Sequence, residues 1–313
     1  MEKPFINLSV NPWYYCNFRC NFCYLTEAQL SNKQFLSLER FEEMLDEVMV
    51  HYQVGHIDIY GGEVLLLPVE YLMGLKDILH SRGIDDIVLV TNLSLTNAVS
   101  EDPDFEISVS YDFGAREKHE LVFQNMLMMP NRFNILTLAS RTFLDTVSVD
   151  EYVDTMNLLS QLKGAEIKPY STNQANVHDV KYTEYEEFVW AVINHPDRRF
   201  YFENETQIKA SLAGERNAFS NDHVYITPEG KFAVLEFDVH GHEFFLNVDT
   251  AEGYQEWAEL EVVYIKDNSF CKTCPFLGNC LSEHLRDVES LEHSCNGFRN
   301  LLERYQAHED GTR

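Results

Sequence analysis

Apolar and polar residues alternate with two different periods along the first half of the chain, and these periods predict strands followed by helices. Residues 5–10 alternate in the manner of a half-buried strand, and residues 56–60 form a second such segment. Between them, Ser37 can cap a helix whose apolar residues recur at helical spacing, namely Phe41, Met44, Leu45, Val48 and Met49. Further strands are predicted over residues 86–92, 106–112, 134–138 and 165–170, with helices near 69–81 and 149–162. This alternation indicates an α/β fold with a parallel sheet and right-handed crossovers.

The pattern changes in the second half of the chain, which we expect to be organised differently. Residues 171–182 are polar and without period, and they predict a loop. A helix is expected to begin near Thr183, and from Asp222 the chain shifts to short strands with a hairpin about residues 228–230. We therefore predict three parts, which are a core over residues 1–182, a connecting helical segment over 183–221 and a small C-terminal domain over 222–313.

Composition places the chain among globular proteins and narrows the choice of partners. Of its 313 residues, 45% are hydrophobic, which is enough for a sizeable core. The sequence has no apolar run of about 18 residues and no N-terminal signal pattern, so we expect a cytoplasmic protein without a membrane partner. The formal net charge is −27 and no basic tract occurs. Because phosphate-backbone binding depends on clustered Lys and Arg, this charge argues against nucleic acid as a partner.

Seven cysteines fall into two groups at opposite ends of the chain, which are Cys16, Cys20 and Cys23, and then Cys271, Cys274, Cys280 and Cys295. An odd number divided in this way indicates two metal sites rather than a disulfide framework. The first group has the spacing C-x3-C-x2-C. A cubane iron–sulfur cluster normally takes four thiolates, so a group of three leaves one iron open to another ligand. The alternatives are three unrelated buried thiols or a zinc site, although structural zinc normally takes four ligands.

With Phe22 before the last cysteine, residues 16–24 resemble the defining motif of the radical S-adenosylmethionine (SAM) enzymes. The resemblance implies a [4Fe-4S] cluster on Cys16, Cys20 and Cys23 whose open iron binds SAM, with Phe22 as a cofactor contact. It further implies that reduction of the cluster splits SAM into methionine and a 5′-deoxyadenosyl radical, which abstracts hydrogen from a substrate. The implied fold is a partial (β/α)6 barrel of the TIM type.

The resemblance extends to residues that follow the predicted strands. Gly61, Gly62 and Glu63 come after the second strand, where the family's glycines let the backbone approach the methionine moiety and the carboxylate contacts the amino group of SAM. Asn92 ends the third strand, and Ser110 and Asp112 end the fourth, where contacts with SAM are also implied. Phe113 departs from the glycine that is common there. Ordinary turn formation is the alternative for these positions.

The second cysteine group, together with the predicted hairpin, resembles the SPASM extension of radical SAM enzymes. The full extension holds two auxiliary [4Fe-4S] clusters, but residues 233–235 and His284 stand where cysteines of the inner cluster are expected. The resemblance therefore implies a truncated SPASM or twitch-like domain with one auxiliary [4Fe-4S] cluster on Cys271, Cys274, Cys280 and Cys295. A zinc ion suits four thiolates equally well, and spacing alone leaves both open.

The resemblance implies an enzyme of the radical SAM class that abstracts hydrogen from its substrate. A peptide substrate is the first expectation, because SPASM enzymes commonly modify peptides. Oxidation or rearrangement of a small metabolite, such as a sugar or an aminocyclitol, is the alternative, and a non-catalytic metal-binding scaffold is a more remote one. An electron donor such as flavodoxin or ferredoxin is an expected partner.

Overall fold

The fold is that of a computed structural model, which describes residues 3–170, 180–219, 221–238, 243–282 and 295–311. Within these ranges, nine strands form one sheet in the order β6-β5-β4-β3-β2-β1-β7-β8-β9. The strands are β1 (Phe5–Val10), β2 (Gln53–Ile59), β3 (Ile87–Thr91), β4 (Glu106–Ser110), β5 (Phe133–Ala139), β6 (Leu162–Pro169), β7 (His223–Ile226), β8 (Phe232–Asp238) and β9 (Glu243–Val248). The pairings from β6 through to β7 are parallel, whereas β8 and β9 add in antiparallel fashion.

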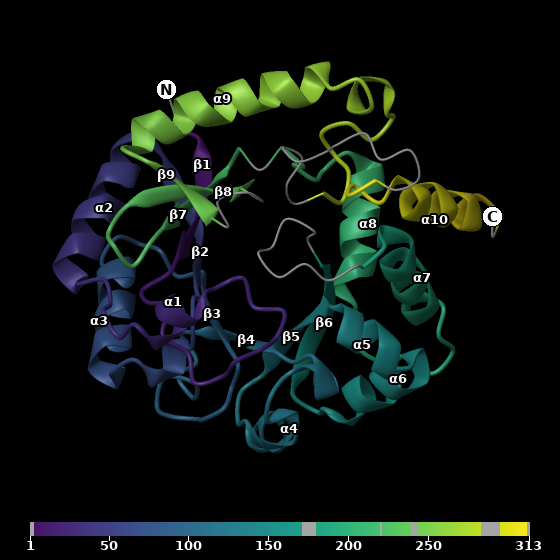
Figure 1. Cartoon of the computed structure of the whole chain (residues 1–313), viewed down its shortest axis with the longest axis horizontal. Helices are drawn as coiled ribbons and strands as arrows, with labels where there is room; N and C mark the ends of the chain where they lie inside the picture. The colour runs from purple at the N-terminus through teal and green to yellow at the C-terminus, as the bar shows by residue number, and fades with distance from the viewer. Residues whose placement is uncertain (1–2, 171–179, 220, 239–242, 283–294, 312–313) are drawn as a thin grey trace.

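The helices lie mainly on the outside of this curved sheet, as Figure 1 shows for α2 to α7. The α-helices are α1 (Glu27–Ser31), α2 (Leu38–His51), α3 (Val69–His80), α4 (His119–Met128), α5 (Arg141–Thr146), α6 (Val149–Leu158), α7 (Tyr182–Ile193), α8 (Glu203–Ala213), α9 (Ala251–Asp267) and α10 (Arg299–Gly311). The short 3-10 helices in the described ranges are η1 (Val64–Leu66), η2 (Phe113–Ala115) and η3 (Cys271–Thr273). None of the helices in the described ranges combines the length and the apolar character that crossing a membrane requires.

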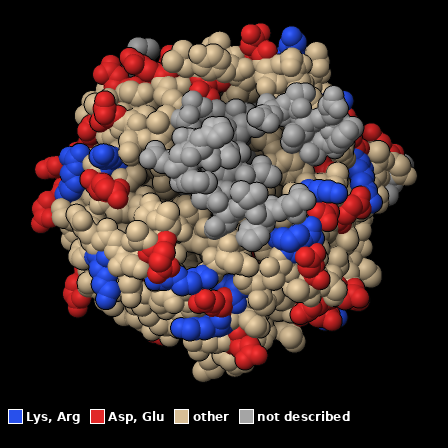
Figure 2. Space-filling model, in the orientation of Figure 1, with Lys and Arg blue, Asp and Glu red and all other residues tan. Residues whose placement is uncertain are grey.

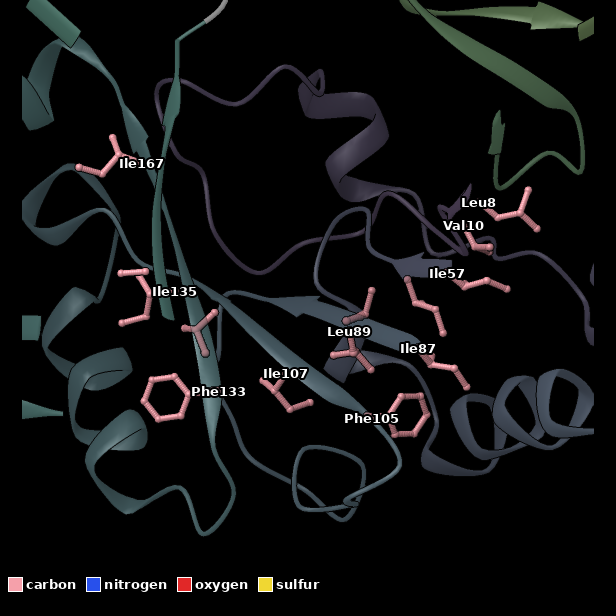
Figure 3. Packing of buried hydrophobic residues seen from close by; sticks show 14 of the residues in the cluster. Leu8, Val10, Ile57, Ile87, Leu89, Phe105, Ile107, Phe133, Ile135 and Ile167 are labelled. Atoms are coloured by element: carbon pink, nitrogen blue, oxygen red, sulfur yellow. The ribbon is translucent and has the colours of Figure 1, made fainter. Parts of the chain in front are cut away.

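The alternation of residues along the strands produces the main core. Every second strand residue points outward under the helices, and Figure 3 shows this layer for Leu8, Ile57, Leu89, Ile107 and Ile135, all of which are fully buried. The six strands and the helix cap that the sequence predicts are confirmed, and the Ser37 side chain accepts a hydrogen bond from the Arg40 backbone N–H at 3.1 Å. The predicted α/β fold with a parallel sheet is therefore confirmed.

The predicted hairpin forms as well, but its place in the sheet was not expected. β7 and β8 pair around a turn in which the Thr227 N–H donates to the Lys231 carbonyl at 2.9 Å. β7 also pairs in parallel with β1, so the hairpin extends the sheet of the first six strands. The division of the chain into parts over 1–182, 183–221 and 222–313 stays a prediction, and the sheet continues across the last of these boundaries.

The opposite edge of the sheet, at β6, is closed by a side chain. The Ile167 N–H donates to Asn204 Oδ1 and Asn204 Nδ2 donates to the Ile167 carbonyl, both at 2.8 Å, so the amide of Asn204 imitates a neighbouring strand. Asn204 also donates to the Tyr185 hydroxyl at 3.0 Å. Pairing the edge in this way removes a row of open backbone groups on which another chain could pair.

We predict that Asn204→Ala lowers the free energy of unfolding by about 1–3 kcal/mol, because it leaves the buried Ile167 N–H without its acceptor. Chemical denaturation measures this change. Lys209→Ala on the same helix is the control, since Lys209 forms an exposed ion pair with Glu205 and its loss is expected to change stability by less than about 0.5 kcal/mol. Equal effects of the two substitutions would contradict the role of the Asn204 amide.

Candidate functional site

A cavity of about 1360 Å³ lies on the concave side of the sheet. Because alternate strand residues point to opposite faces, the positions that do not enter the main core line this cavity, and many of them are polar. Ser9 and His223 face it from neighbouring strands, with Ser9 Oγ 2.6 Å from His223 Nε2. Lys163 and Glu106 form an ion pair of 2.5 Å along its wall. The cavity therefore presents groups of both charges.

The surface shows a similar mixture of charges. Figure 2 shows Lys and Arg interspersed with Asp and Glu over one face of the molecule. No continuous basic stripe is visible on that face, although grey atoms cover its centre. Phosphate-backbone binding depends on clustered cations, and the exclusion of nucleic acid as a partner stays a prediction.

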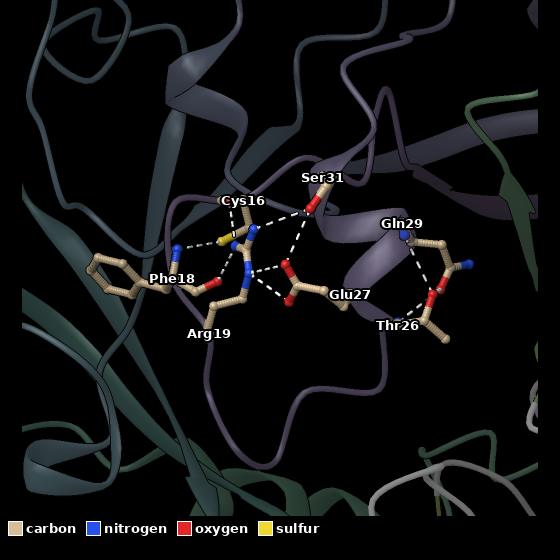
Figure 4. A network of polar contacts seen from close by, with 7 residues as sticks. All are labelled: Cys16, Phe18, Arg19, Thr26, Glu27, Gln29 and Ser31. Carbon is tan, nitrogen blue, oxygen red and sulfur yellow. Dashed lines mark hydrogen bonds and ion pairs between the residues drawn. The ribbon is translucent and has the colours of Figure 1, made fainter.

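The cysteine loop, which we define as residues 11–26, runs from β1 to α1. Arg19 holds its shape, as Figure 4 shows, by donating from Nη1 to the carbonyl oxygens of Cys16 at 2.7 Å and Phe18 at 2.8 Å. The same guanidinium pairs with Glu27 at 2.8 Å, which ties the loop to the first turn of α1. None of the seven cysteines, all of which lie in the described part of the chain, forms a disulfide.

N–H groups are directed at the sulfurs of the cysteine loop. The Phe18 backbone N–H donates to Cys16 Sγ at 3.4 Å, Asn92 Nδ2 reaches the same sulfur at 3.7 Å, and Arg116 Nη1 lies 3.8 Å from Cys20 Sγ. Burial raises the pKa of all three thiols, that of Cys23 to about 11. Thiols of this kind release their protons when a metal binds, and N–H donors stabilise the resulting thiolates. Three thiols on one loop with donors at their sulfurs fit a cluster bound by three cysteines.

Gly61 and Gly62 lie against the backbone of the cysteine loop. The Gly62 N–H donates to the Trp13 carbonyl at 3.1 Å, and the Glu63 N–H donates to the Tyr15 carbonyl at 2.8 Å. A Cβ atom on Gly62 would lie 2.1 Å from the Tyr15 carbonyl oxygen, and one on Gly61 would lie 2.3 Å from that of Trp13. The structure therefore explains both glycines by their close approach to the loop, a contact that the sequence analysis did not foresee.

Glu63 is fully buried, and both of its carboxylate oxygens accept hydrogen bonds from within the protein. Oε1 accepts from the Leu65 N–H at 2.9 Å and the Thr91 hydroxyl at 2.6 Å, and Oε2 accepts from the Asn92 N–H at 2.6 Å. Burial raises the pKa of Glu63, whereas these donors act in the opposite direction. The carboxylate thus holds Asn92, whose side chain reaches Cys16. The SAM contact expected of Glu63 stays a prediction.

The remaining predicted contacts lie at the end of β4. Asp112 is buried, accepts from the Leu138 N–H at 2.5 Å, and pairs with Arg116 at 2.6 Å. Ser110 is half-buried and pairs with Leu136 in the sheet. Arg116 was not predicted from the sequence, and its guanidinium also lies 5.4 Å from the ring centroid of Phe22. Its only sequence signal is a charged residue four positions after Asp112.

Phe22 is itself buried, and it packs in a small cluster with Tyr170 and Val180. These two residues flank the range 171–179, which lies outside the described part of the chain. Phe22, the aromatic residue before Cys23, thus forms part of an apolar contact between the cysteine loop and the end of β6. Its contact with SAM stays a prediction.

The four C-terminal cysteines also come together. The Cys274 N–H donates to the Cys271 carbonyl at 2.8 Å, and a Cβ atom on Gly297 would lie 2.7 Å from Cys280 Sγ. Burial raises the pKa of Cys271 to about 11 and that of Cys280 to about 12, and the neighbouring cysteines, Cys295 among them, add to both shifts. His284 lies outside the described residues. Among the described residues, no group of three His, Cys, Asp or Glu side chains is placed to hold a single metal ion.

Comparison with known proteins places this site in a family. Residues 10–112, which include the cysteine loop, the glycine turn and Asp112, match the family model of the radical SAM superfamily. The chain contains a radical SAM superfamily domain. It is 31% identical over 96 residues to a GTP 3′,8-cyclase from Picosynechococcus sp. (strain ATCC 27264 / PCC 7002 / PR-6). That match covers 28% of this chain and 27% of the cyclase, so the chain spans about a quarter of the relative's length.

Solved structures of low sequence identity share the fold of this chain. Native anSMEcpe with bound AdoMet aligns with a TM-score of 0.73 at 15% identity, over 99% of both chains. SuiB from Streptococcus suis, bound to its precursor peptide SuiA, aligns with a TM-score of 0.62 at 15% identity, over 90% of this chain and 71% of SuiB. These alignments agree with the predicted partial barrel of the TIM type.

We predict that Gly62→Ala destabilises the protein by about 1–3 kcal/mol and lowers the iron that the cysteine loop binds after reconstitution, because the added Cβ must displace the Tyr14 and Tyr15 carbonyls. Iron analysis and denaturation measure the two effects. Gly55→Ala in β2 is the matched control, since its Cβ would meet Phe5 at an ordinary 3.5 Å. Full iron binding by the Gly62 variant would show that the loop does not depend on this contact.

Proposed function

We propose that this protein is a radical SAM enzyme whose catalytic [4Fe-4S] cluster is bound by Cys16, Cys20 and Cys23. The observation that carries this proposal is the set of three thiols on one loop, with N–H donors directed at Cys16 and Cys20, inside the region that matches the family. When bound, such a cluster supplies an open iron for SAM and the electron that releases a 5′-deoxyadenosyl radical.

The chain's own residues would bind and orient the reactants, which is the protein's part in cofactor chemistry. Gly61 and Gly62 hold the cysteine loop at the carboxyl end of β2, and Asn92 supports Cys16 from the end of β3. We assign SAM binding to this rim, with Phe22, Gly61, Gly62, Glu63, Asn92, Ser110 and Asp112 as the candidate residues. Of these, Ser110 is half-buried and belongs to a strand that lines the cavity, whereas Glu63 and Asp112 act mainly by holding the rim together.

A peptide is the substrate that the site supports best. The cavity of about 1360 Å³ exceeds the 300–1,000 Å³ or so that is usual for a small-molecule site, so it has room for a segment of peptide chain. Its polar and charged walls suit a substrate with many hydrogen-bonding groups. SuiB has been solved with a precursor peptide, and anSMEcpe with AdoMet and the Cp18Cys peptide aligns over 99% of this chain with a TM-score of 0.69 at 16% identity.

We further propose a truncated SPASM-like region whose single auxiliary [4Fe-4S] cluster is bound by Cys271, Cys274, Cys280 and Cys295. An added Cβ on Gly297 would lie 2.7 Å from Cys280 Sγ and 3.5 Å from Cys295 Sγ, so these two sulfurs flank the same glycine, which supports a common site. With four thiolate ligands it has no open iron, so we assign it to electron transfer or structural support. Seven cysteines without disulfides suit a reducing compartment. We therefore propose a cytoplasmic enzyme that receives electrons from a flavodoxin or ferredoxin.

We predict that the reconstituted protein, reduced with dithionite in the absence of oxygen, converts SAM to 5′-deoxyadenosine, and that Cys16→Ala reduces this conversion to the level of a protein-free control.

To identify the substrate class, the enzyme is given either the peptide fraction or the small-metabolite fraction of cells grown in deuterated water. Deuterium in the 5′-deoxyadenosine is expected from the peptide fraction, because the transferred hydrogen comes from the substrate.

Two results would contradict the proposal at different points. If Cys16→Ala retains the iron, the EPR signal and the product, the cluster assignment is wrong. If deuterium enters 5′-deoxyadenosine only from the small-metabolite fraction, the enzyme class stands and the peptide substrate is wrong.

For the C-terminal site we predict about eight irons per chain after reconstitution, four for each cubane, and about four in the variant that lacks Cys16, Cys20 and Cys23. A structural zinc site would instead leave that variant with one zinc and no iron. Elemental analysis separates these outcomes. Because all four auxiliary positions are thiolates, substrate is expected to leave the EPR spectrum of this variant unchanged, and a change in ligation would contradict the proposed role.

A further inference from the structure

We infer that Arg116 is a positioning residue that raises the reduction potential of the cluster proposed on Cys16, Cys20 and Cys23. This inference rests on the proposed function and concerns a residue to which neither the sequence pattern nor the comparisons assign a role. Arg116 follows η2 and lies opposite the cysteine loop, 96 positions along the chain from Cys20.

The guanidinium has three partners, all of them at the candidate site. Nη1 lies 3.8 Å from Cys20 Sγ, Nε and Nη2 both lie 2.6 Å from Asp112 Oδ2, and the group sits 5.4 Å from the centroid of the Phe22 ring. Only 14% of the side chain is exposed. A rigid, planar group with several donors suits this task better than the ammonium of a lysine, because it can bond the carboxylate and the sulfur at once.

A cation at this position acts on the cluster through its sulfur ligand. Reduction adds negative charge to a cluster, and a nearby positive charge or an N–H···S hydrogen bond stabilises the reduced form. The effect is larger for a desolvated group, since charges interact more strongly away from water. Arg116 therefore makes the cluster easier to reduce by a cellular electron donor.

Asp112 sets the strength of this effect. Its carboxylate is buried and is held by the Leu138 N–H, so it fixes the guanidinium beside Cys20 and at the same time offsets part of its charge. Glu117 also faces Cys20, from an exposed position where its charge is screened, and Glu63 faces Cys16. Removing the cation and removing its carboxylate partner must then move the potential in opposite directions. A guanidinium that only packs the loop in place would not produce this pattern.

The test is a redox titration of reconstituted full-length protein without SAM, followed by EPR. The signal of interest is the one that the Cys16, Cys20 and Cys23 triple variant lacks. We expect Arg116→Gln to lower the reduced-to-oxidised ratio about tenfold at a fixed potential, which equals 59 mV for a one-electron couple. Arg116→Lys is expected to lower it less, because the positive charge remains. Asp112→Asn is expected to raise the ratio, because the cation loses its counter-charge.

Arg82→Gln is the matched control, because Arg82 is similarly covered, with 16% of its side chain exposed, and bonds Glu42 and Asp46 of α2. It is expected to leave the potential unchanged. Equal potentials for Arg116→Gln and the unaltered protein, or shifts of the same sign for Arg116→Gln and Asp112→Asn, overturn the inference. If Arg116→Gln assembles no cluster, the reduction potentials of Arg116→Lys and Asp112→Asn are compared instead. A potential of the Asp112→Asn protein at or below that of the Arg116→Lys protein overturns the inference. Absence of any signal that depends on the loop cysteines would instead overturn the proposed function.

Discussion

Main-chain hydrogen bonds join the turn at residues 61–63 to the cysteine loop, and the arrangement of the whole candidate site depends on this contact. The two backbones approach so closely that a side chain on Gly62 would overlap the Tyr15 carbonyl, so the turn consists of glycines. The approach carries Glu63 into the interior, where a carboxylate without partners would be destabilising. Its partners are the ends of η1 and β3, and through Asn92 the network reaches Cys16. This backbone contact therefore connects the turn at residues 61–63, the end of β3 and the cysteine loop around Cys16.

The parts of the fold that depend on short-range pattern could be predicted from the sequence. Apolar alternation located the first six strands, and the serine at residue 37 marked the start of α2. The cysteine spacing pointed to the loop after β1, which lies inside the region that matches the family model, whereas the role of the C-terminal cysteines stays a prediction. The partners of these segments could not be predicted, because they are set by packing between distant parts of the chain. The glycines were expected to make room for SAM, yet the nearest backbone belongs to the cysteine loop.

Arg116 and Asn204 show the same limit at single residues. A charged side chain after a strand is ordinarily solvated, and nothing near Arg116 in sequence indicates that the fold turns it toward Cys20. An asparagine in the first turn of a helix is also ordinary, whereas Asn204 completes the hydrogen bonding of an edge strand. In both cases the residue can be read from the sequence, but its distant partner cannot. That partner is Cys20 for Arg116 and Ile167 for Asn204.

The parallel pairing of β7 with β1 has a consequence for how the chain is made. β1 ends at Val10 and β7 ends at Ile226, so the ribosome must add 226 − 10 = 216 residues between them. At about 5–20 residues per second, this takes roughly 10–40 s. During that interval one edge of β1, next to the cysteine loop, lacks its final neighbour. During synthesis, the edge of β1 that β7 finally covers is therefore open for longer than the edge that β2 covers.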